Sequence, residues 1–261
     1  MTIGGVNNLS TLNSTQKAMQ TSMAKIASGN KFPSAANGPA EYGILQRMYS
    51  NAGAISQSNA NTQTASSMLK TASGATEDIV NSLSSLREKL IQAGNGTNGA
   101  SDLATLQKSV DETIATIDQS AANATYNGKQ LLDGSQSITV ASADGYENVA
   151  LGDMSSQGLG LTDGKGNTTF DLKESGGIAA ALDSALNQSA SLGAVEQGME
   201  YQSANYTTQE TSLYDSASTM GDTDIAAEVT KLRSAEVQNQ FALHAMNLQN
   251  HNRASVLSLL G

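Results

Sequence analysis

Residues 218–261 of the chain read STMGDTDIAAEVTKLRSAEVQNQFALHAMNLQNHNRASVLSLLG, and this stretch decides the fold. At the helical period it carries apolar residues on two sides rather than one. The first side consists of Ile225, Val229, Leu232, Leu243, Met246, Leu257 and Leu260, and the second of Val237, Phe241, His244 and Leu248. A surface helix of a monomer needs only one apolar stripe, so we expect one partner from the same chain and another from copies of the protein.

The N-terminal segment is a candidate for the partner within the chain. Its apolar residues are spaced three and four apart and form a single seam of the coiled-coil kind. The seam residues are Leu9, Leu12, Gln16, Met19, Met23 and Ile26. We therefore expect the first side, beginning at Ile225, to pack antiparallel against residues 9–26, and the second side, with Phe241, to contact neighbouring subunits.

The composition limits the size of the core. Hydrophobic residues make up 38% of the chain and aromatic residues 4%, and there is no tryptophan. Such a chain lacks the bulk for a wide globular core, so we expect thin helical layers that are stable mainly where they associate. The absence of cysteine excludes disulfides, thiolate metal sites and cysteine nucleophiles.

Charge is unevenly distributed along the chain. The net charge is -10, yet residues 1–40 hold three lysines and no acid, and the acidic excess lies in residues 41–220. This pattern favours ends that are buried by association and a middle that faces water, and nucleic-acid binding is a poor fit. We also expect no cleaved secretory signal and no membrane span, because neither sequence pattern is present.

Two helices are expected in the first half of the middle region. Residues 41–93 contain no proline, and a stripe of residues three and four apart runs along their second half: Ala65, Leu69, Ala72, Thr76, Ile79, Leu83, Leu86 and Leu90. The sequence GNGTNG at residues 94–99 predicts a turn, after which Ser101 or Asp102 caps a helix that breaks near Asn127-Gly128.

Residues 134–177 differ in character because glycines separate short β-prone segments. We expect strands at residues 137–141 and 168–172, with hairpin turns at Asp144-Gly145 and Asp163-Gly164. Helix then resumes, and every seventh residue is apolar: Ile178, Ala185, Leu192, Met199, Tyr206, Leu213 and Met220. This repeat predicts a long supercoiled helix, and Asp222 or Asp224 is expected to cap the helix that follows.

The expected fold class is mainly α, an elongated antiparallel helical bundle or coiled coil built from both chain ends, with a small β-hairpin module at the tip. Residues 1–40 and 218–261 form an inner terminal-helix domain. Residues 41–133 and 178–217 form a rod-like helical domain, and residues 134–177 form a small surface-exposed module.

The sequence shows no catalytic or cofactor site. His244 and His251 lie seven residues apart without a carboxylate at a metal-binding spacing. The segment 163–167 superficially resembles a calcium loop, but Lys165 stands where a ligand oxygen is needed. We therefore expect a protein that is not an enzyme and that holds no metal or cofactor.

Several motifs resemble those of bacterial flagellins, and together they cover nearly the whole chain outside residues 134–177. They are LNSTQ at 12–16, SMAKIASG at 22–29, ATYNGKQLLDG at 124–134, LGA at 192–194, DTDIAAE at 222–228 and VLSLL at 256–260. The resemblance implies a short flagellin, a structural subunit that polymerises into the extracellular flagellar filament for motility. The terminal helices would then form the core of this homopolymer.

The resemblance also implies partners and an export route. A flagellin leaves the cell through the type III export channel without a cleaved signal peptide, helped by an export chaperone, and assembles beneath a filament cap next to hook-associated proteins. Arg87 and Glu88 match the region that the vertebrate innate receptor recognises in flagellins. For these two residues a solvated helix face is an equally good interpretation.

Three departures from the family pattern stand out, two at the linkers and one near the C-terminus. Asn37-Gly38 replaces paired aspartates, Thr219 replaces an arginine and Arg253 replaces a proline. The first two changes imply that a salt-bridge cluster of the family is absent here. Two other functions remain open at this point: a hook-filament junction protein of the flagellum, and a secreted monomeric helical adhesin or effector.

Overall fold

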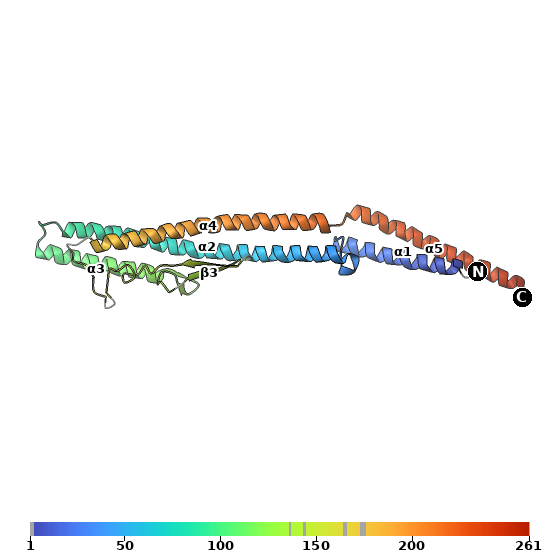
Figure 1. Cartoon of the computed structure of the whole chain (residues 1–261), viewed down its shortest axis with the longest axis horizontal. Helices are drawn as coiled ribbons and strands as arrows, with labels where there is room; N and C mark the ends of the chain where they lie inside the picture. The colour runs from blue at the N-terminus through green and yellow to red at the C-terminus, as the bar shows by residue number, and fades with distance from the viewer. Residues whose placement is uncertain (1–2, 136, 143–144, 164–165, 173–175, 261) are drawn as a thin grey trace. The chain divides into compact units, whose positions relative to one another are not determined.

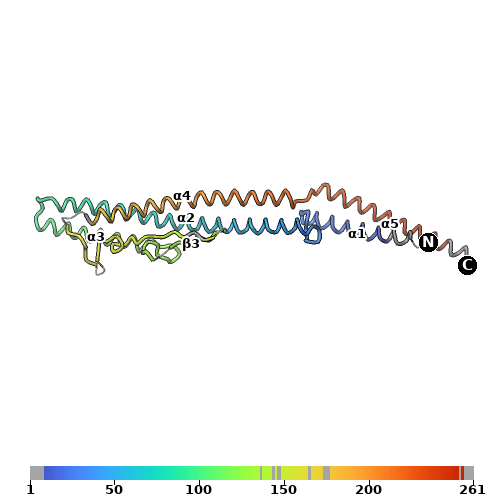
Figure 2. Tube along the Cα trace, viewed as in Figure 1, coloured from blue at the N-terminus to red at the C-terminus, as the bar shows by residue number. Residues whose placement is uncertain are grey.

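The computed structural model describes residues 3–260 except 136, 143–144, 164–165 and 173–175, and it leaves aside the side chains at 3–8, 146–147, 176, 253 and 256–260. Long helices dominate, and the strands are short (Figures 1 and 2). The elements are α1 (Ile3–Ser28), η1 (Ala35–Asn37), α2 (Pro39–Ala93), α3 (Ala100–Asn123), β1 (Thr125–Tyr126), β2 (Lys129–Gln130), β3 (Ser137–Ser142), β4 (Gly145–Ala150), α4 (Gly176–Gly221) and α5 (Ile225–Leu260). The mainly α fold class is therefore confirmed.

The chain divides into two compact units. The terminal unit comprises Met1–Ala52 and Thr211–Gly261, and the middle unit comprises Gly53–Glu210. Both α2 and α4 contribute to each unit. The division at residues 41 and 218 that the sequence suggested stays a prediction about domains.

The core of the middle unit is built from three helices. All eight stripe residues expected on α2 are buried, as are Val110, Ile114 and Ile117 of α3. On α4 the repeat of seven is buried from Ile178 through Tyr206. α2 and α4 are also joined by polar contacts, since Ser203 Oγ donates a hydrogen bond of 2.6 Å to Asn59 Oδ1.

Two hairpins follow α3. β1 and β2 pair across Asn127 and Gly128, whose φ angles of 50° and 76° fit the type I′ turn that an Asn-Gly pair favours. β3 and β4 pair antiparallel from Ser137↔Ala150 to Ser142↔Gly145, which confirms the strand expected at 137–141. The strand expected at 168–172 is wrong, because only Thr168 forms an isolated bridge, with Thr162. Asp144 and Gly164 lie outside the described residues.

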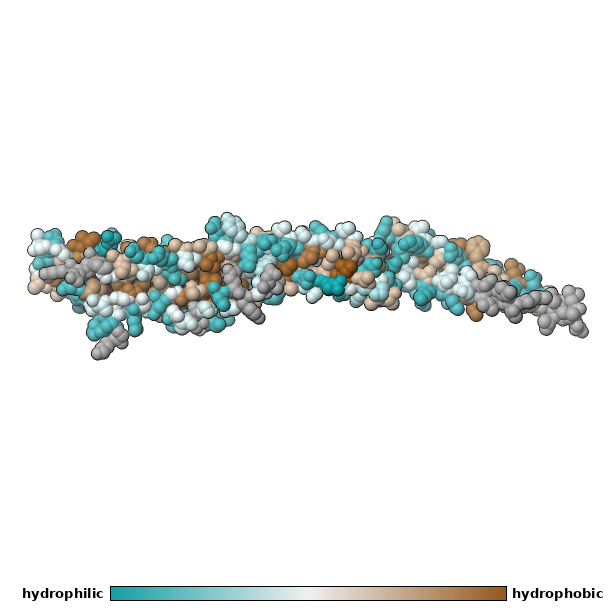
Figure 3. All heavy atoms as spheres, viewed as in Figure 1, coloured by the Kyte–Doolittle hydropathy of each residue, from teal (hydrophilic) through white to brown (hydrophobic). Residues whose placement is uncertain are grey.

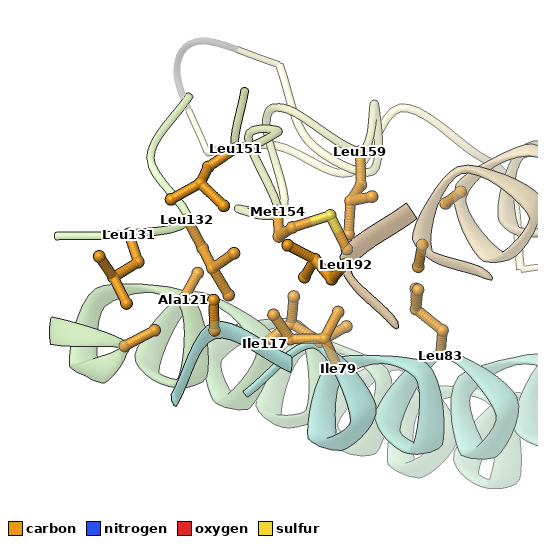
Figure 4. Packing of buried hydrophobic residues seen from close by; sticks show 14 of the residues in the cluster. Ile79, Leu83, Ile117, Ala121, Leu131, Leu132, Leu151, Met154, Leu159 and Leu192 are labelled. Carbon is orange, nitrogen blue, oxygen red and sulfur yellow. The ribbon is translucent and has the colours of Figure 1, made fainter. Parts of the chain in front are cut away.

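The segment after α3 is part of the middle unit's core. Alternate residues of β3, Ile138 and Val140, are buried, and Leu131, Leu132, Leu151, Met154, Leu159 and Leu161 are buried with them. Figure 4 shows Leu132 and Met154 gathered with Ile117 and Leu192 in one apolar cluster.

Polar contacts also hold this segment against the sides of the helices. Asn61 Nδ2 on α2 donates to the carbonyl of Ala141 at 3.0 Å. The Asp118 carboxylate on α3 accepts hydrogen bonds from the backbone N–H and hydroxyl of Ser156. The β module is thus more deeply integrated than the separate exposed tip that the glycine-rich sequence suggested, because its period-two alternation gives it an apolar inner face.

The buried position of Leu161 makes this integration testable. Leu161→Ala should lower the free energy of unfolding of the middle unit by about 2–4 kcal/mol, because it leaves a cavity in the shared core. Thermal unfolding followed by circular dichroism at the helix band measures this. Leu186→Ala removes the same atoms from an exposed position on α4 and should cost less than about 1 kcal/mol. An unchanged helix transition in Leu161→Ala would show that the module folds separately.

Candidate functional site

The described part of the chain holds no cluster of three or more histidine, aspartate or glutamate side chains that could bind a metal ion. His244 and His251 are both exposed on α5. No described helix combines the length and the apolar character that crossing a bilayer requires. The distinctive surface of the molecule is instead the pair of terminal helices, α1 and α5, which lie side by side in the terminal unit (Figure 1).

The seam between α1 and α5 consists of small and polar residues together with a few larger apolar ones. Its buried members are Thr15 and Ser22 on α1 and Glu228, Ala235 and Ala242 on α5. Leu12, Met19 and Ile26 on α1, and Val229, Leu232 and Met246 on α5, are half-buried. The small side chains allow the two helices to approach closely, but they leave little room for large ones.

Two polar contacts set the alignment of the antiparallel pair. Ser22 Oγ donates a buried hydrogen bond of 2.9 Å to Glu228 Oε1. Further along the seam, Asn239 Nδ2 donates to Thr15 Oγ1 at 3.4 Å. Polar groups at seam positions specify the register of paired helices, because a shifted alignment leaves them without partners.

Glu228 is the only carboxylate in this seam among the described residues, and its side chain is 6% exposed. Lys231 Nζ lies 2.9 Å from Oε2, and Lys25 Nζ lies 3.9 Å from Oε1. The hydrogen bond from Lys231 is the main cause of a pKa below the ordinary 4.5 of a glutamate; burial opposes it, and Ser22 and Lys25 add to it. Glu228 is therefore held ionised at neutral pH.

Backbone contacts tie the end of α1 to the start of α5. The N–H of Lys31 donates to the carbonyl of Gly221 at 2.6 Å, and the N–H of Thr223 donates to the carbonyl of Gly29 at 2.9 Å. Asp224 Oδ1 accepts from the N–H of Ala227, which confirms the expected cap of α5.

At the linker before α2, the Asn37 side chain accepts a hydrogen bond from Ser34 Oγ. A Cβ atom at Gly38 would lie 2.7 Å from the Phe32 ring, so the linker packs closely at this glycine.

Large apolar side chains stand outside the seam. On α5, Phe241 is 68% exposed and Leu248 is 64% exposed, and Val237 is also exposed. Apolar side chains of this kind form separate brown patches on a mainly polar surface in the face that Figure 3 shows. The exposure of these three residues is what a second contact side requires, while their contact with other copies stays a prediction.

Five residues expected in the intrachain seam are exposed instead: Leu9, Gln16, Met23, Ile225 and Leu243. The assignment of these residues to that seam was wrong. The buried positions on α1 are Thr15 and Ser22, one residue before Gln16 and Met23, so the helix is rotated from the expected orientation. The side chain of Leu257 lies outside the described residues, and Arg87 and Glu88 are exposed on α2 in the middle unit.

Sequence reasoning missed Thr15, Ser22, Glu228, Ala235 and Ala242. A signal for them is present, because Thr15 and Ser22 are seven residues apart and so are Glu228, Ala235 and Ala242. A heptad of small and polar residues is a weaker signal than a heptad of leucines and methionines, although it allows closer helix packing.

The position of Glu228 predicts a pH dependence. A carboxyl whose pKa is lowered by folding stabilises the folded state above about pH 4.5 and loses this contribution as the pH falls through its folded value. Glu228→Gln should therefore lower stability by about 1–2 kcal/mol at pH 6, and the difference from the original chain should shrink as the pH falls below about 4.5. Thermal unfolding across this pH range measures it.

Glu236→Gln is the matched control, since Glu236 is exposed on the same helix. It should leave the pH dependence unchanged. An equal acid sensitivity of the Glu228→Gln variant and the original chain would show that this carboxylate contributes nothing to the seam.

Comparison with known families accounts for both ends of the chain. Residues 3–137 match the model of the bacterial flagellin N-terminal helical region, and residues 176–260 match the bacterial flagellin C-terminal helical region. The two matches include all of α1, α2, α3, α4 and α5. The segment between them contains most of β3, all of β4 and the loops that follow it.

Individual flagellins are similar over different lengths. The chain is 33% identical to a flagellin of Escherichia coli O127:H6 over 65% of its own length, but it spans only 33% of that protein. It is 27% identical to flagellin FljM of Caulobacter vibrioides, with 98% of this chain and 96% of that protein covered.

A crystal structure of Bacillus cereus flagellin is 26% identical, with a TM-score of 0.47, over 56% of this chain and 88% of that one. The family assignment depends on the two helical-region matches, the first of which alone covers more than half of the residues. The chain therefore belongs to the bacterial flagellin family, whose members are structural subunits of the flagellar filament.

Proposed function

We propose that copies of this flagellin polymerise through the exposed apolar side chains of the terminal unit. The observation that carries the proposal is the position of Phe241 and Leu248, which project from α5 although most of the buried positions in its seam with α1 hold smaller residues. Burying a side chain of this size contributes about 1.5–3 kcal/mol. The exposed side chains therefore favour association, because the contact between α1 and α5 within one chain does not bury them.

The exposed residues lie on two different flanks of the helix pair. Phe241 precedes the buried Ala242 and Leu243 follows it, so the two side chains point to opposite flanks of α5. Met23 in the same way follows the buried Ser22 on α1. A heterologous contact requires two different apolar surfaces on one subunit. Such contacts build open helical filaments when the rotation between successive subunits does not close into a ring.

We further propose, from membership of the flagellin family, where the rest of the chain lies in the filament. The terminal helices of successive subunits form the inner tube, residues 41–133 and 178–217 form the next layer, and residues 134–177 lie at the outer surface. Arg87 and Glu88, exposed on α2, are available there to an innate receptor. The outer layer carries most of the acidic residues, which suits a surface in contact with water.

Membership of the family further supports an extracellular location reached without a cleaved signal peptide. An export chaperone would cover the apolar surface of α5 before assembly, and the filament cap and hook-associated proteins would contact the same terminal helices. The role is structural, and no catalytic or cofactor-dependent step is assigned to the chain.

Phe241→Asp tests the assembly surface. The variant should remain soluble as a monomer and be exported, because Phe241 makes no buried contact within the chain, but it should not form filaments. Electron microscopy of purified protein with added filament seeds measures this. Gln240→Asp adds the same charge at the neighbouring exposed position without removing an apolar contact, and it should assemble. Normal filaments from the Phe241→Asp variant would contradict the proposal.

A further inference from the structure

A shallow groove runs between α1 and α5 in the terminal unit, with a volume of about 450 Å³. Its charged lining residues are Lys17, Lys25, Lys231 and Glu228. The groove thus holds three lysines and one carboxylate, and we call it the lysine groove. Its net charge is +2 in a chain whose total is -10.

The positive charge of the groove is only partly neutralised. Glu228 is engaged by Lys231 and Lys25. In the described part of the chain, the ammonium group of Lys17 has no ion pair, and it is exposed. The groove can therefore accept at least one further carboxylate without displacing an existing contact.

The same unit carries an acidic stretch at the end of α4 and the start of α5. Its members, Asp215, Asp222 and Asp224, are all exposed. None of the ion pairs formed between described residues includes them. Asp222 accepts a hydrogen bond from Ser218, and Asp224 caps α5, so both carboxylates are fixed in place, and neither forms an ion pair with a described residue.

We propose that the lysine groove of one subunit receives the acidic stretch of a second copy of this chain. The inference rests on the proposed polymerisation and names the polar part of its contact. Each subunit carries both partners, as a heterologous contact requires. Opposite charges at a forming contact orient the incoming subunit and speed its association.

The position of the groove relative to the apolar surface identifies a second copy as the occupant. Lys231 precedes the seam residue Leu232, as Phe241 precedes the seam residue Ala242. Lys231 and Phe241 therefore lie on the same flank of α5, and a subunit that covers Phe241 also approaches the groove. The groove and Phe241 thus lie on one flank of the helix pair.

Charge reversal and charge exchange test the proposal. Lys17→Glu and Asp215→Lys each change an exposed side chain, so circular dichroism of the monomers should not change. Each single variant should elongate wild-type seeds about tenfold more slowly at low salt, in line with the electrostatic acceleration of association. The double variant, with the two charges exchanged, should recover most of the wild-type rate. Lys108→Glu, at an exposed lysine of α3 in the middle unit, is the matched control and should elongate normally.

Three results would overturn the proposal. Single variants that elongate at the wild-type rate would show that the groove makes no contact in the filament, while polymerisation itself would stand. A double variant slowed by both changes independently would show that Lys17 and Asp215 do not meet. Wild-type monomer that binds RNA or anionic lipid vesicles through Lys17, with elongation unaffected by Lys17→Glu, would assign the groove to another ligand. If wild-type protein itself does not elongate seeds, the proposed polymerisation fails as well.

Discussion

The close seam between α1 and α5 is the constraint on which the rest of the terminal unit depends. Thr15, Ser22, Ala235 and Ala242 are small enough to bring the two helices together, but they bury little apolar surface. The larger side chains are therefore left on the outer flanks. A helix pair of this kind is only marginally stable alone and gains most of its stability from further partners.

The polar contacts within the seam complement this weak apolar packing. A slide of one heptad would take Glu228 away from Ser22 and Lys25, while Lys231, on the same helix, would move with it. The carboxylate would then lose its ion pair with Lys25, and a buried charge that loses a partner is destabilised. The hydrogen bond between Asn239 and Thr15 would also be lost if the helices slid past one another. We infer that these contacts specify the alignment of the pair, while the exposed apolar residues supply the drive for association.

Much of the fold was predictable, because its signals are strong and local. The heptad from Ile178 to Tyr206 and the stripe from Ala65 to Leu90 are buried as their spacing indicates. The Asn127-Gly128 turn and the Asp224 cap also follow from local chemistry. The sequence was less informative about α1, where two stripes one residue apart compete. The larger side chains predicted that the stripe through Met23 would face α5. The stripe through Ser22 faces α5 instead, because its small side chains let the two helices pack closely. Which stripe is buried therefore depends on the residues of α5 and not on α1 alone.

The central claim is that the exposed apolar side chains of the terminal helices are covered by other copies of the chain. Hydroxyl-radical footprinting with mass spectrometry, applied to monomers and to filaments of the same protein, measures it most directly. The account predicts that oxidation of Met23 and Phe241 falls sharply on assembly, while oxidation of Tyr201, exposed in the middle unit, changes less. Equal oxidation of Met23 and Phe241 in monomers and filaments would contradict it.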